Sequence, residues 1–266
     1  MHRELEILCE AVKHAGQRVL HLAKEGFETY RKKDRSPVTS ADLEANRILQ
    51  EALIGHFPED GWLSEESPDN SERLGKKRVW VVDPIDGTKH FMKGIPQYAI
   101  SVALVENEKL IVGVVYNPAT QELFSSTRGS GLCLNGTPIQ VDHPIGKRLS
   151  ILLNPSRLEK GEFETYERHA TCHPMGSIAY TLALVAAGKA DGTLNFDSLH
   201  EWDIAAGVLL VQEAGGIAMD SNKRPISFNQ PKTEVHGVIA ARPGARESIE
   251  FLMNTVAIEE ATKKQA

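Results

Sequence analysis

This chain of 266 residues is poor in cysteine, has no excess of basic residues and contains no long apolar run. Its three cysteines, Cys9, Cys133 and Cys172, include no CxxC pair, which argues against a disulfide framework or a zinc site and favours a reducing cytoplasm. Lys and Arg number 30 against 36 Asp and Glu, and a net charge of −6 gives no basic footprint for a nucleic-acid polymer. No run approaches the roughly 18 apolar residues of a membrane helix, so no membrane partner is expected.

The composition is otherwise that of a folded globular chain, with 41% hydrophobic and 25% charged residues. Apolar residues from Leu5 to Leu22 recur every three or four positions, which predicts an amphipathic helix ending near Gly26. The segment 31–40 is charged and broken by proline, and it leads into a second helical pattern for which Thr39 is the expected N-cap.

Strand patterns occupy the middle of the chain. A β-branched run covers 79–82, and similar runs at 98–105 and 110–116 flank a polar turn, which predicts an antiparallel meander. After about residue 145 strands and helices alternate, with strands expected at 150–153 and 235–241 and helices at 178–187, 204–214 and 245–256. The pattern predicts two sheet-containing halves, an α+β half over 1–145 and an α/β half over 146–266.

The strand at 79–82 runs into Asp83-Pro84-Ile85-Asp86-Gly87-Thr88. Asp83 and Asp86 flank a proline, so a turn can aim both carboxylates at one point, and Gly87 allows backbone N–H groups to approach a ligand closely. The alternative is a turn that ends the strand, with aspartate as its cap.

Two further acidic features flank this motif in sequence. Glu65 and Glu66 form a pair within LSEES, and Asp203 stands at the start of an apolar helix. Each has an ordinary alternative, a solvated surface pair or an acid in the first turn of a helix. If they converge, two carboxylates about 4 Å apart repel by roughly 4 kcal/mol at an effective dielectric of 20, so the cluster needs a cation. Oxygen ligands favour Mg²⁺ over zinc or copper.

The acidic pair, DPIDGT and WDIAAG, in this order, resemble the inositol monophosphatase superfamily of Mg²⁺-dependent, often lithium-sensitive phosphatases. The resemblance runs from about Lys32 to Gly216. It implies an α/β (α+β) fold, an αβαβα layered sandwich, in which the two halves meet at the metal site. It also implies a small-molecule phosphate ester as substrate, and either a monomer or a homodimer.

The resemblance implies a role for each matched residue. The first Mg²⁺ would be held by Glu66, Asp83 and the carbonyl of Ile85, and the second by three carboxylates, those of Asp83, Asp86 and Asp203. Glu65 would help a weaker third ion, so two or three Mg²⁺ ions are expected. Glu66 is therefore counted among both the metal ligands and the catalytic residues.

The remaining matched residues would handle the substrate and the attacking water. The backbone amides of Gly87 and Thr88 would hold the phosphate, and Thr88 and Asp42 would orient and deprotonate the water. For Asp42 the alternative is an acid in the first turn of its helix. One metal would lower the pKa of the water and the other would stabilise the leaving alkoxide, so no covalent nucleophile is needed.

Within the superfamily, three features favour a 3′(2′),5′-bisphosphate nucleotidase that acts on 3′-phosphoadenosine 5′-phosphate. Lys89 follows DGT as in that branch, the segment 36–39 (SPVT) precedes Asp42 and SEES, and Phe196 stands where inositol phosphatases carry a sugar-binding glutamate. Lys89 and Phe196 are predicted to contact substrate. Against this, the segment 94–101 is more similar to the inositol enzymes. Inositol-1-monophosphatase and fructose-1,6-bisphosphatase activities are the alternatives, and histidinol phosphate and NADP stay open as substrates.

Two other classes of protein would also use clustered carboxylates. A non-catalytic phosphate-binding module would keep the fold and lose a metal ligand, yet every matched ligand position that uses a side chain holds a carboxylate. A Ca²⁺-binding protein is disfavoured because no EF-hand spacing occurs.

Overall fold

The computed structural model describes residues 2–33, 35–142, 144–156 and 163–263, with the backbone alone at 163 and 257–263. Helix α1 (His2–Glu25) confirms the amphipathic helix predicted to end near Gly26. Helix α2 (Ser40–His56) follows its predicted N-cap, since the Thr39 side chain accepts from the backbone N–H groups of Ala41 and Asp42. The end of α1 and the start of α2 therefore lie where the sequence predicts them.

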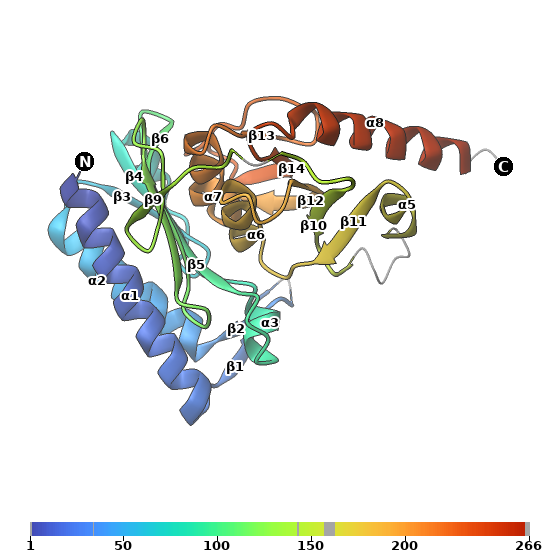
Figure 1. Cartoon of the computed structure of the whole chain (residues 1–266). Coiled ribbons are helices and arrows are strands. Elements are labelled where there is room, and N and C mark those ends of the chain that lie inside the picture. The colour runs from blue at the N-terminus through green and yellow to red at the C-terminus, as the bar shows by residue number, and fades with distance from the viewer. Residues whose placement is uncertain (1, 34, 143, 157–162, 264–266) are drawn as a thin grey trace.

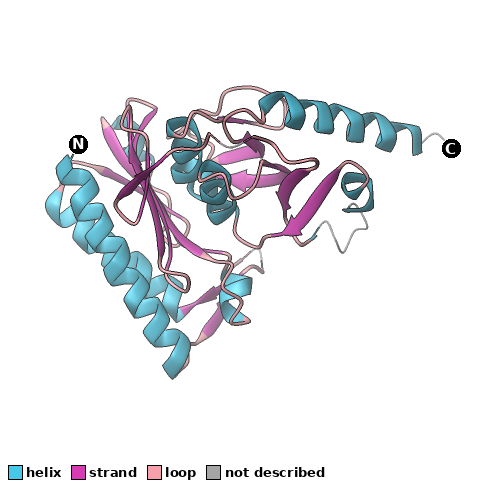
Figure 2. Ribbon diagram, in the orientation of Figure 1, coloured by secondary structure: helices cyan, strands magenta, loops and turns pink. Residues whose placement is uncertain are grey.

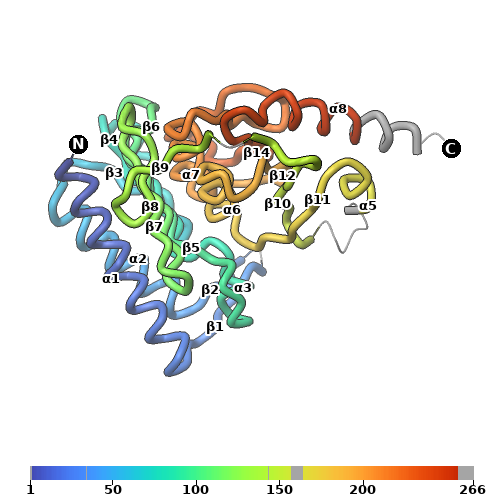
Figure 3. Tube along the Cα trace, viewed as in Figure 1, coloured from blue at the N-terminus to red at the C-terminus, as the bar shows by residue number. Residues whose placement is uncertain are grey.

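A short hairpin lies between these helices, where the sequence pattern predicts no strand. Strands β1 (Thr29–Arg31) and β2 (Pro37–Thr39) pair antiparallel. In Figures 1 and 3 this hairpin lies beside α3 (Thr88–Met92), away from the two large sheets.

A seven-stranded sheet confirms the predicted meander. Its strands, in spatial order, are β3 (Gly61–Ser64), β4 (Arg78–Asp86), β5 (Ala99–Glu106), β6 (Lys109–Asn117), β7 (Glu122–Thr127), β8 (Leu132–Leu134) and β9 (Thr137–Ile139). The strands from β4 to β9 are antiparallel, and β3 pairs parallel with β4 after the 3₁₀ helix η1 (Ser71–Gly75) has made the crossover. Strand β4 extends beyond the predicted 79–82 and includes the aspartates of the DPIDGT motif.

A five-stranded sheet follows, in the order β11 (Ala170–Pro174), β10 (Leu149–Leu153), β12 (Gly192–His200), β14 (Glu234–Ala241) and β13 (Ile217–Met219). The accompanying helices are α5 (Phe163–Glu167), α6 (Ile178–Ala186), α7 (Glu201–Glu213) and α8 (Arg246–Lys263). Helix α7 begins three residues before the predicted 204, so Asp203 lies inside its first turn. The large sheets lie on either side of residue 145, and the division into halves there stays a prediction.

The layers alternate, as Figures 1 and 2 show. Along β4, Trp80 and Val82 belong to the core beneath α1 and α2, whereas Val79 and Val81 belong to the core that includes α6 and α7. This is the two-residue period of a strand buried on both faces. On the far side, apolar residues of the five-stranded sheet pack with α8. The predicted αβαβα layered sandwich is confirmed. Within the described part of the chain, none of the helices has the length and apolar character to cross a bilayer.

Candidate active site

The end of β4 carries the first two aspartates. Its pairing with β5 is irregular between Asp83 and Asp86, and the N–H of Ile85 donates to Asp83 Oδ1 at 3.0 Å. Asp83 is only 1% exposed. Burial raises the pKa of Asp83 well above its usual range, and the charges of Glu65, Asp86 and Asp203 raise it further. The turn therefore gathers like charges around one buried carboxylate.

Gly87 turns the chain from β4 into α3. Its φ of +95° lies in the left-handed region, and a Cβ there would stand 2.7 Å from the carbonyl oxygen of Gln97. The turn presents Thr88, whose Oγ1 lies 3.0 Å from Asp42 Oδ1 and 3.1 Å from the carbonyl oxygen of Ile85. The predicted pair Thr88 and Asp42 is thus brought together from elements 46 positions apart.

Asp42 is the third residue of α2, and one of its carboxylate oxygens accepts two hydrogen bonds from Thr39. Its Oδ2 accepts from the N–H of Thr39 at 2.8 Å and from the Thr39 hydroxyl, which completes a capping box. Burial nevertheless raises the pKa of Asp42, against the lowering effect of these bonds. The helix-start alternative therefore accounts for Oδ2, while Oδ1 is left to face Thr88.

Asp86 lies at the N-terminus of α6. Its Oδ2 accepts from Ser177 Oγ and from the N–H of Ala179, each at 2.6 Å. Burial raises the pKa of Asp86 to about 7 even though both hydrogen bonds lower it. Ser177 is the N-cap of α6 and is absent from the predicted site, although a serine before an apolar helical run was a usable capping signal.

Asp203 is the third residue of α7 and belongs to the same group of charges. Its Oδ2 accepts from the N–H of His200 at 2.6 Å. Burial raises the pKa of Asp203 well above its usual range, and the charge of Asp86 raises it further. Asp203 is therefore a helix-start acid and a member of the carboxylate cluster at once.

Glu65 and Glu66 share one cation, which the sequence-based site lacks. Lys32 Nζ lies 2.7 Å from Glu65 Oε1 and 2.6 Å from Glu66 Oε1. Burial raises the pKa of Glu66 to about 7, whereas the two glutamates keep the pKa of Lys32 above its ordinary value although burial lowers it. Lys32 follows β1 in the charged segment 31–40. The sequence would have indicated Lys32 as a site residue only if a hairpin had been predicted there.

The donor set fits a hard divalent cation. It consists of carboxylates and the Ile85 carbonyl, whose oxygens suit Mg²⁺, and its mutual repulsion is relieved by positive charge. Among the described residues, no group of three or more His, Cys, Asp or Glu side chains has the arrangement needed to hold a metal ion. The ammonium of Lys32 supplies positive charge to Glu65 and Glu66 instead.

The two predicted specificity residues lie outside this cluster. Phe196 lies on β12 at a shift in register against β14, with 40% of its surface exposed. Lys89 is exposed on α3 and lines a hollow with Arg31 and Lys93.

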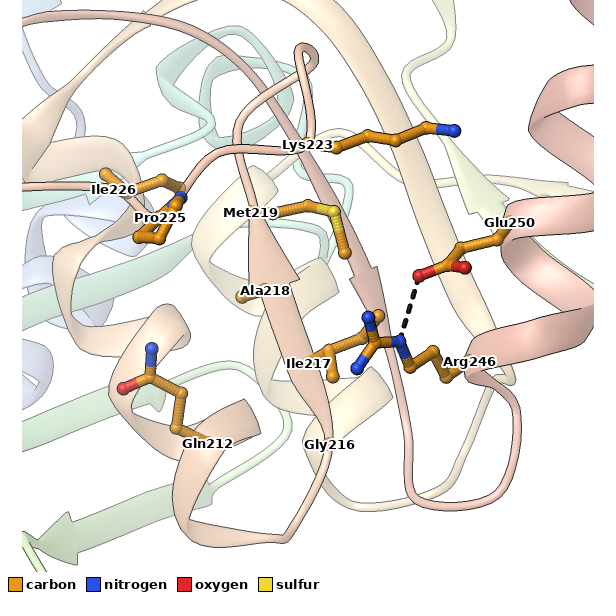
Figure 4. A pocket seen from close by; sticks show the side chains of 10 residues that line it. All are labelled: Gln212, Gly216, Ile217, Ala218, Met219, Lys223, Pro225, Ile226, Arg246 and Glu250. Carbon is orange, nitrogen blue, oxygen red and sulfur yellow. Dashed lines mark hydrogen bonds and ion pairs between the residues drawn. The ribbon is translucent and has the colours of Figure 1, made fainter.

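A separate hollow of about 560 Å³ lies between β13 and α8, lined by Met219, Lys223, Arg246 and Glu250 among others (Figure 4). Along α8, Arg246 Nε donates to Glu250 Oε1 at 2.9 Å. No predicted site residue lines this hollow.

Comparisons with known proteins agree with the fold and the motifs. The Inositol monophosphatase family matches residues 1–259. An inositol-1-monophosphatase of Rhizobium meliloti (strain 1021) is 41% identical over 196 residues, covering 69% of this chain and 72% of that protein. A histidinol-phosphatase of Chlorobaculum parvum is 30% identical over 237 residues, covering 84% and 88%. The solved structure of the IMPase of Thermotoga maritima superimposes with a TM-score of 0.83 at 28% identity, covering 97% and 99%.

The fold and the carboxylate cluster define a metal-dependent phosphatase class. The chain belongs to the inositol monophosphatase family, whose members are phosphatases acting on small phosphate esters and generally depend on Mg²⁺.

Proposed function

We propose that this chain is a Mg²⁺-dependent phosphomonoesterase that hydrolyses a small-molecule phosphate ester with an activated water. One observation carries the proposal: clustered carboxylates with raised pKa values surround the turn that presents Thr88 to Asp42. Such a cluster costs free energy unless a cation joins it. A catalytic function explains why the chain keeps it.

The ligands are assigned as the family resemblance implies. Glu66, Asp83 and the carbonyl of Ile85 would hold the first ion, and the second would be held by three carboxylates, those of Asp83, Asp86 and Asp203. Glu65 would serve a weaker third ion. When bound, Mg²⁺ supplies an acidified water and charge stabilisation for the phosphoryl group and the leaving oxygen. To hold the metal, Glu66 would have to give up its ion pair with Lys32.

The protein's own groups position the attacking water. Thr88 Oγ1 donates its single hydrogen toward Asp42, so its lone pairs are left to accept a hydrogen from the water. The raised pKa of Asp42 makes it a better proton acceptor than an ordinary aspartate. The N–H groups of Gly87 and Thr88, at the turn, bind the phosphate.

The three cysteines are free, which supports a cytoplasmic enzyme.

Removal of the metal tests the function. Phosphate release is measured with four substrates: 3′-phosphoadenosine 5′-phosphate, inositol 1-phosphate, fructose 1,6-bisphosphate and NADP. At least one of them should be hydrolysed, and its hydrolysis should stop with EDTA and return with Mg²⁺. Asp83→Asn should lower that turnover by about 10²–10³-fold or more, because Asp83 would be a ligand of both ions and several kcal/mol of charge stabilisation would depend on them. Asp142→Asn, an exposed carboxylate elsewhere, is the control. Wild-type turnover in a folded Asp83→Asn variant would remove the two-ion assignment.

At the level of substrate there are two candidates. The exposed ring of Phe196, seven residues before Asp203, favours 3′-phosphoadenosine 5′-phosphate, because an aromatic face stacks on a base and gives a polyol no hydrogen bond. The 41% identity to a protein named inositol-1-monophosphatase favours inositol 1-phosphate.

A substitution at Phe196 separates these candidates. Phe196→Glu should lower the ratio of kcat/KM for the nucleotide to that for inositol 1-phosphate, and Phe251→Glu, a change at an exposed ring on α8, should leave it unchanged. If the wild type prefers inositol 1-phosphate, the nucleotidase assignment is wrong.

A further inference from the structure

A cleft of about 620 Å³ lies between the β1–β2 hairpin and α3, and we name it the cationic cleft. Four of its lining side chains are cations, and they come from both walls: Arg31, Arg35, Lys89 and Lys93. Among the residues that the structure describes, none that lines the cleft is acidic. The hairpin and α3 lie side by side in Figures 1 and 3, so two segments distant in sequence contribute to one concentration of positive charge.

The four cations have no acidic partner among the described residues. Other basic side chains, such as Arg47 and Arg78, form ion pairs, but none of these four pairs with a carboxylate within the described ranges. Lys89 and Lys93 are four residues apart at a helical turn, a spacing at which like charges destabilise. Unrelieved positive charge of this kind attracts an anion.

Neighbouring groups are consistent with a positive cleft. The pKa of His90 is lowered, first by burial and then by the charges of Lys93 and Lys89. The carboxylate of Glu28, close in sequence to the hairpin, accepts from the Tyr30 hydroxyl and does not line the cleft. Arg31 Nη1 donates to the carbonyl oxygen of Arg35 at 3.4 Å, which ties the ends of the hairpin turn together.

The cationic cleft adjoins the candidate active site at both walls. Arg31 lines the cleft and the next residue, Lys32, reaches Glu65 and Glu66. Lys89 lines the cleft and the preceding residue, Thr88, donates to Asp42. On both walls, therefore, the cleft and the carboxylate cluster are contacted by residues that are neighbours in sequence.

We infer that the cationic cleft binds a second phosphate of the substrate whose first phosphate lies at the carboxylates, an inference that rests on the proposed function. Two guanidinium groups offer fork-shaped donors that match phosphate oxygens, and two ammonium groups add point charges. The hydroxyl of Thr29 supplies a further donor, and Met92, 37% exposed, supplies an apolar contact for the ligand's scaffold. The preferred substrate class is therefore a small bisphosphate.

Matched pairs of substrates test the inference. Adenosine 3′-phosphate differs from 3′-phosphoadenosine 5′-phosphate only in the second phosphate, as fructose 1-phosphate differs from fructose 1,6-bisphosphate. In at least one pair the wild-type enzyme with Mg²⁺ should show the higher kcat/KM for the bisphosphate. Arg31→Ala and Lys93→Ala, one from each wall, should each lower the ratio within that pair about tenfold, the value of one charged hydrogen bond. Added salt should lower it too.

Lys223→Ala is the control, because it removes a cation from the other hollow (Figure 4) and should leave the ratio unchanged. The affinities of 3′-phosphoadenosine 5′-phosphate and adenosine 3′-phosphate for the same variants, measured by calorimetry, give a readout independent of turnover.

The possible outcomes separate the inference from the proposed function. Equal kcat/KM within both pairs, with inositol 1-phosphate still hydrolysed, would overturn the inference about the cleft and leave the proposed function intact. Absence of Mg²⁺-dependent hydrolysis would overturn the proposed function. If the two nucleotides then also bound with equal affinity, the inference about the cleft would be wrong as well. A third outcome would assign the cleft to a free anion instead. In that case the enzyme would show no preference within the substrate pairs, sulfate would change the rate of adenosine 3′-phosphate hydrolysis, and Arg31→Ala would abolish this effect.

Discussion

At the scale of single residues, Thr88 combines two contacts that a simple turn does not need. Its one hydroxyl hydrogen has two acceptors, Asp42 Oδ1 and the carbonyl oxygen of Ile85. A hydroxyl has one donor and two lone pairs, so whichever acceptor it serves, lone pairs are left for a water. The contact with Ile85 also places this hydroxyl beside the carbonyl proposed as a ligand.

Thr88→Ala should therefore lower kcat by about 10²-fold and change KM much less, because a group that orients the attacking water acts mainly in the transition state. Steady-state kinetics with Mg²⁺ in excess measure both constants. Thr88→Ser keeps the hydroxyl and should keep most of the rate. An alanine variant that alters KM alone would show that Thr88 only binds substrate.

The sequence could name the carboxylates of the site but not all their partners. The motifs point to Asp83, Asp86 and Asp203 because their residue types and order are specific. Lys32 and Ser177 carry no comparable signal, since a lysine in a charged loop and a serine before a helix are common on any surface. Only tertiary packing brings Ser177 to Asp86, 91 residues away.

At the scale of elements, three helix N-termini meet the cluster. Asp42 and Asp203 are each the third residue of a helix, and Asp86 accepts from the first turn of α6. The positive end of a helix stabilises a carboxylate, which partly offsets the repulsion within the cluster. The same residues that begin the helices thereby hold the candidate ligands in place.

Ser177→Ala should weaken both the helix and the metal site. Loss of the N-cap should cost about 1 kcal/mol of unfolding free energy. Loss of the bond to Asp86 should raise the Mg²⁺ concentration for half-maximal activity about tenfold, as removal of a group behind a metal ligand does. Thermal unfolding and Mg²⁺ titration measure the two effects. Asn70→Ala, which removes the side-chain cap of η1, should lower stability and leave the Mg²⁺ requirement unchanged.

The β1–β2 hairpin shows where pattern reading fails. Its strands are three residues long, and β1 is exposed throughout, so no alternation of apolar and polar residues marks it. A two-stranded ribbon of this kind depends on its neighbours, here α3 and the start of α2. By contrast β5 and β6 are long, apolar and joined by a tight polar turn, and the sequence predicted them closely.

At the scale of the whole molecule, the layered fold determines which acids meet. Strand β4 lies in one sheet, while α6 and α7 fill the layer between the two sheets and bring Ser177 and Asp203 to the end of β4. The packing of the apolar faces is strong enough to hold these like charges together. The folded chain therefore stores electrostatic repulsion that a bound cation would relieve.

Burial of these carboxylates, together with their mutual repulsion, predicts an inverted pH dependence of stability for the metal-free protein. Glu66 and Asp86 have folded-state pKa values of about 7, against ordinary values of 4.5 and 3.8. The folded state thus binds more protons than the unfolded state between about pH 4 and 7, so the free energy of unfolding falls as the pH rises through that window. His90 opposes this, because its lowered pKa adds stability as the pH rises, but it is a single partly exposed group.

In EDTA the melting temperature should be higher at pH 5 than at pH 8 by about 4 °C or more. Mg²⁺ should remove most of the difference, because it stabilises the ionised carboxylates that protons otherwise neutralise. Asp86→Asn should flatten the profile in EDTA, since an amide has no proton to lose, and should also reduce the gain from Mg²⁺. A melting temperature that rises from pH 5 to pH 8 in EDTA would mean that the carboxylates are already relieved by the protein itself, with Lys32 as the first group to examine.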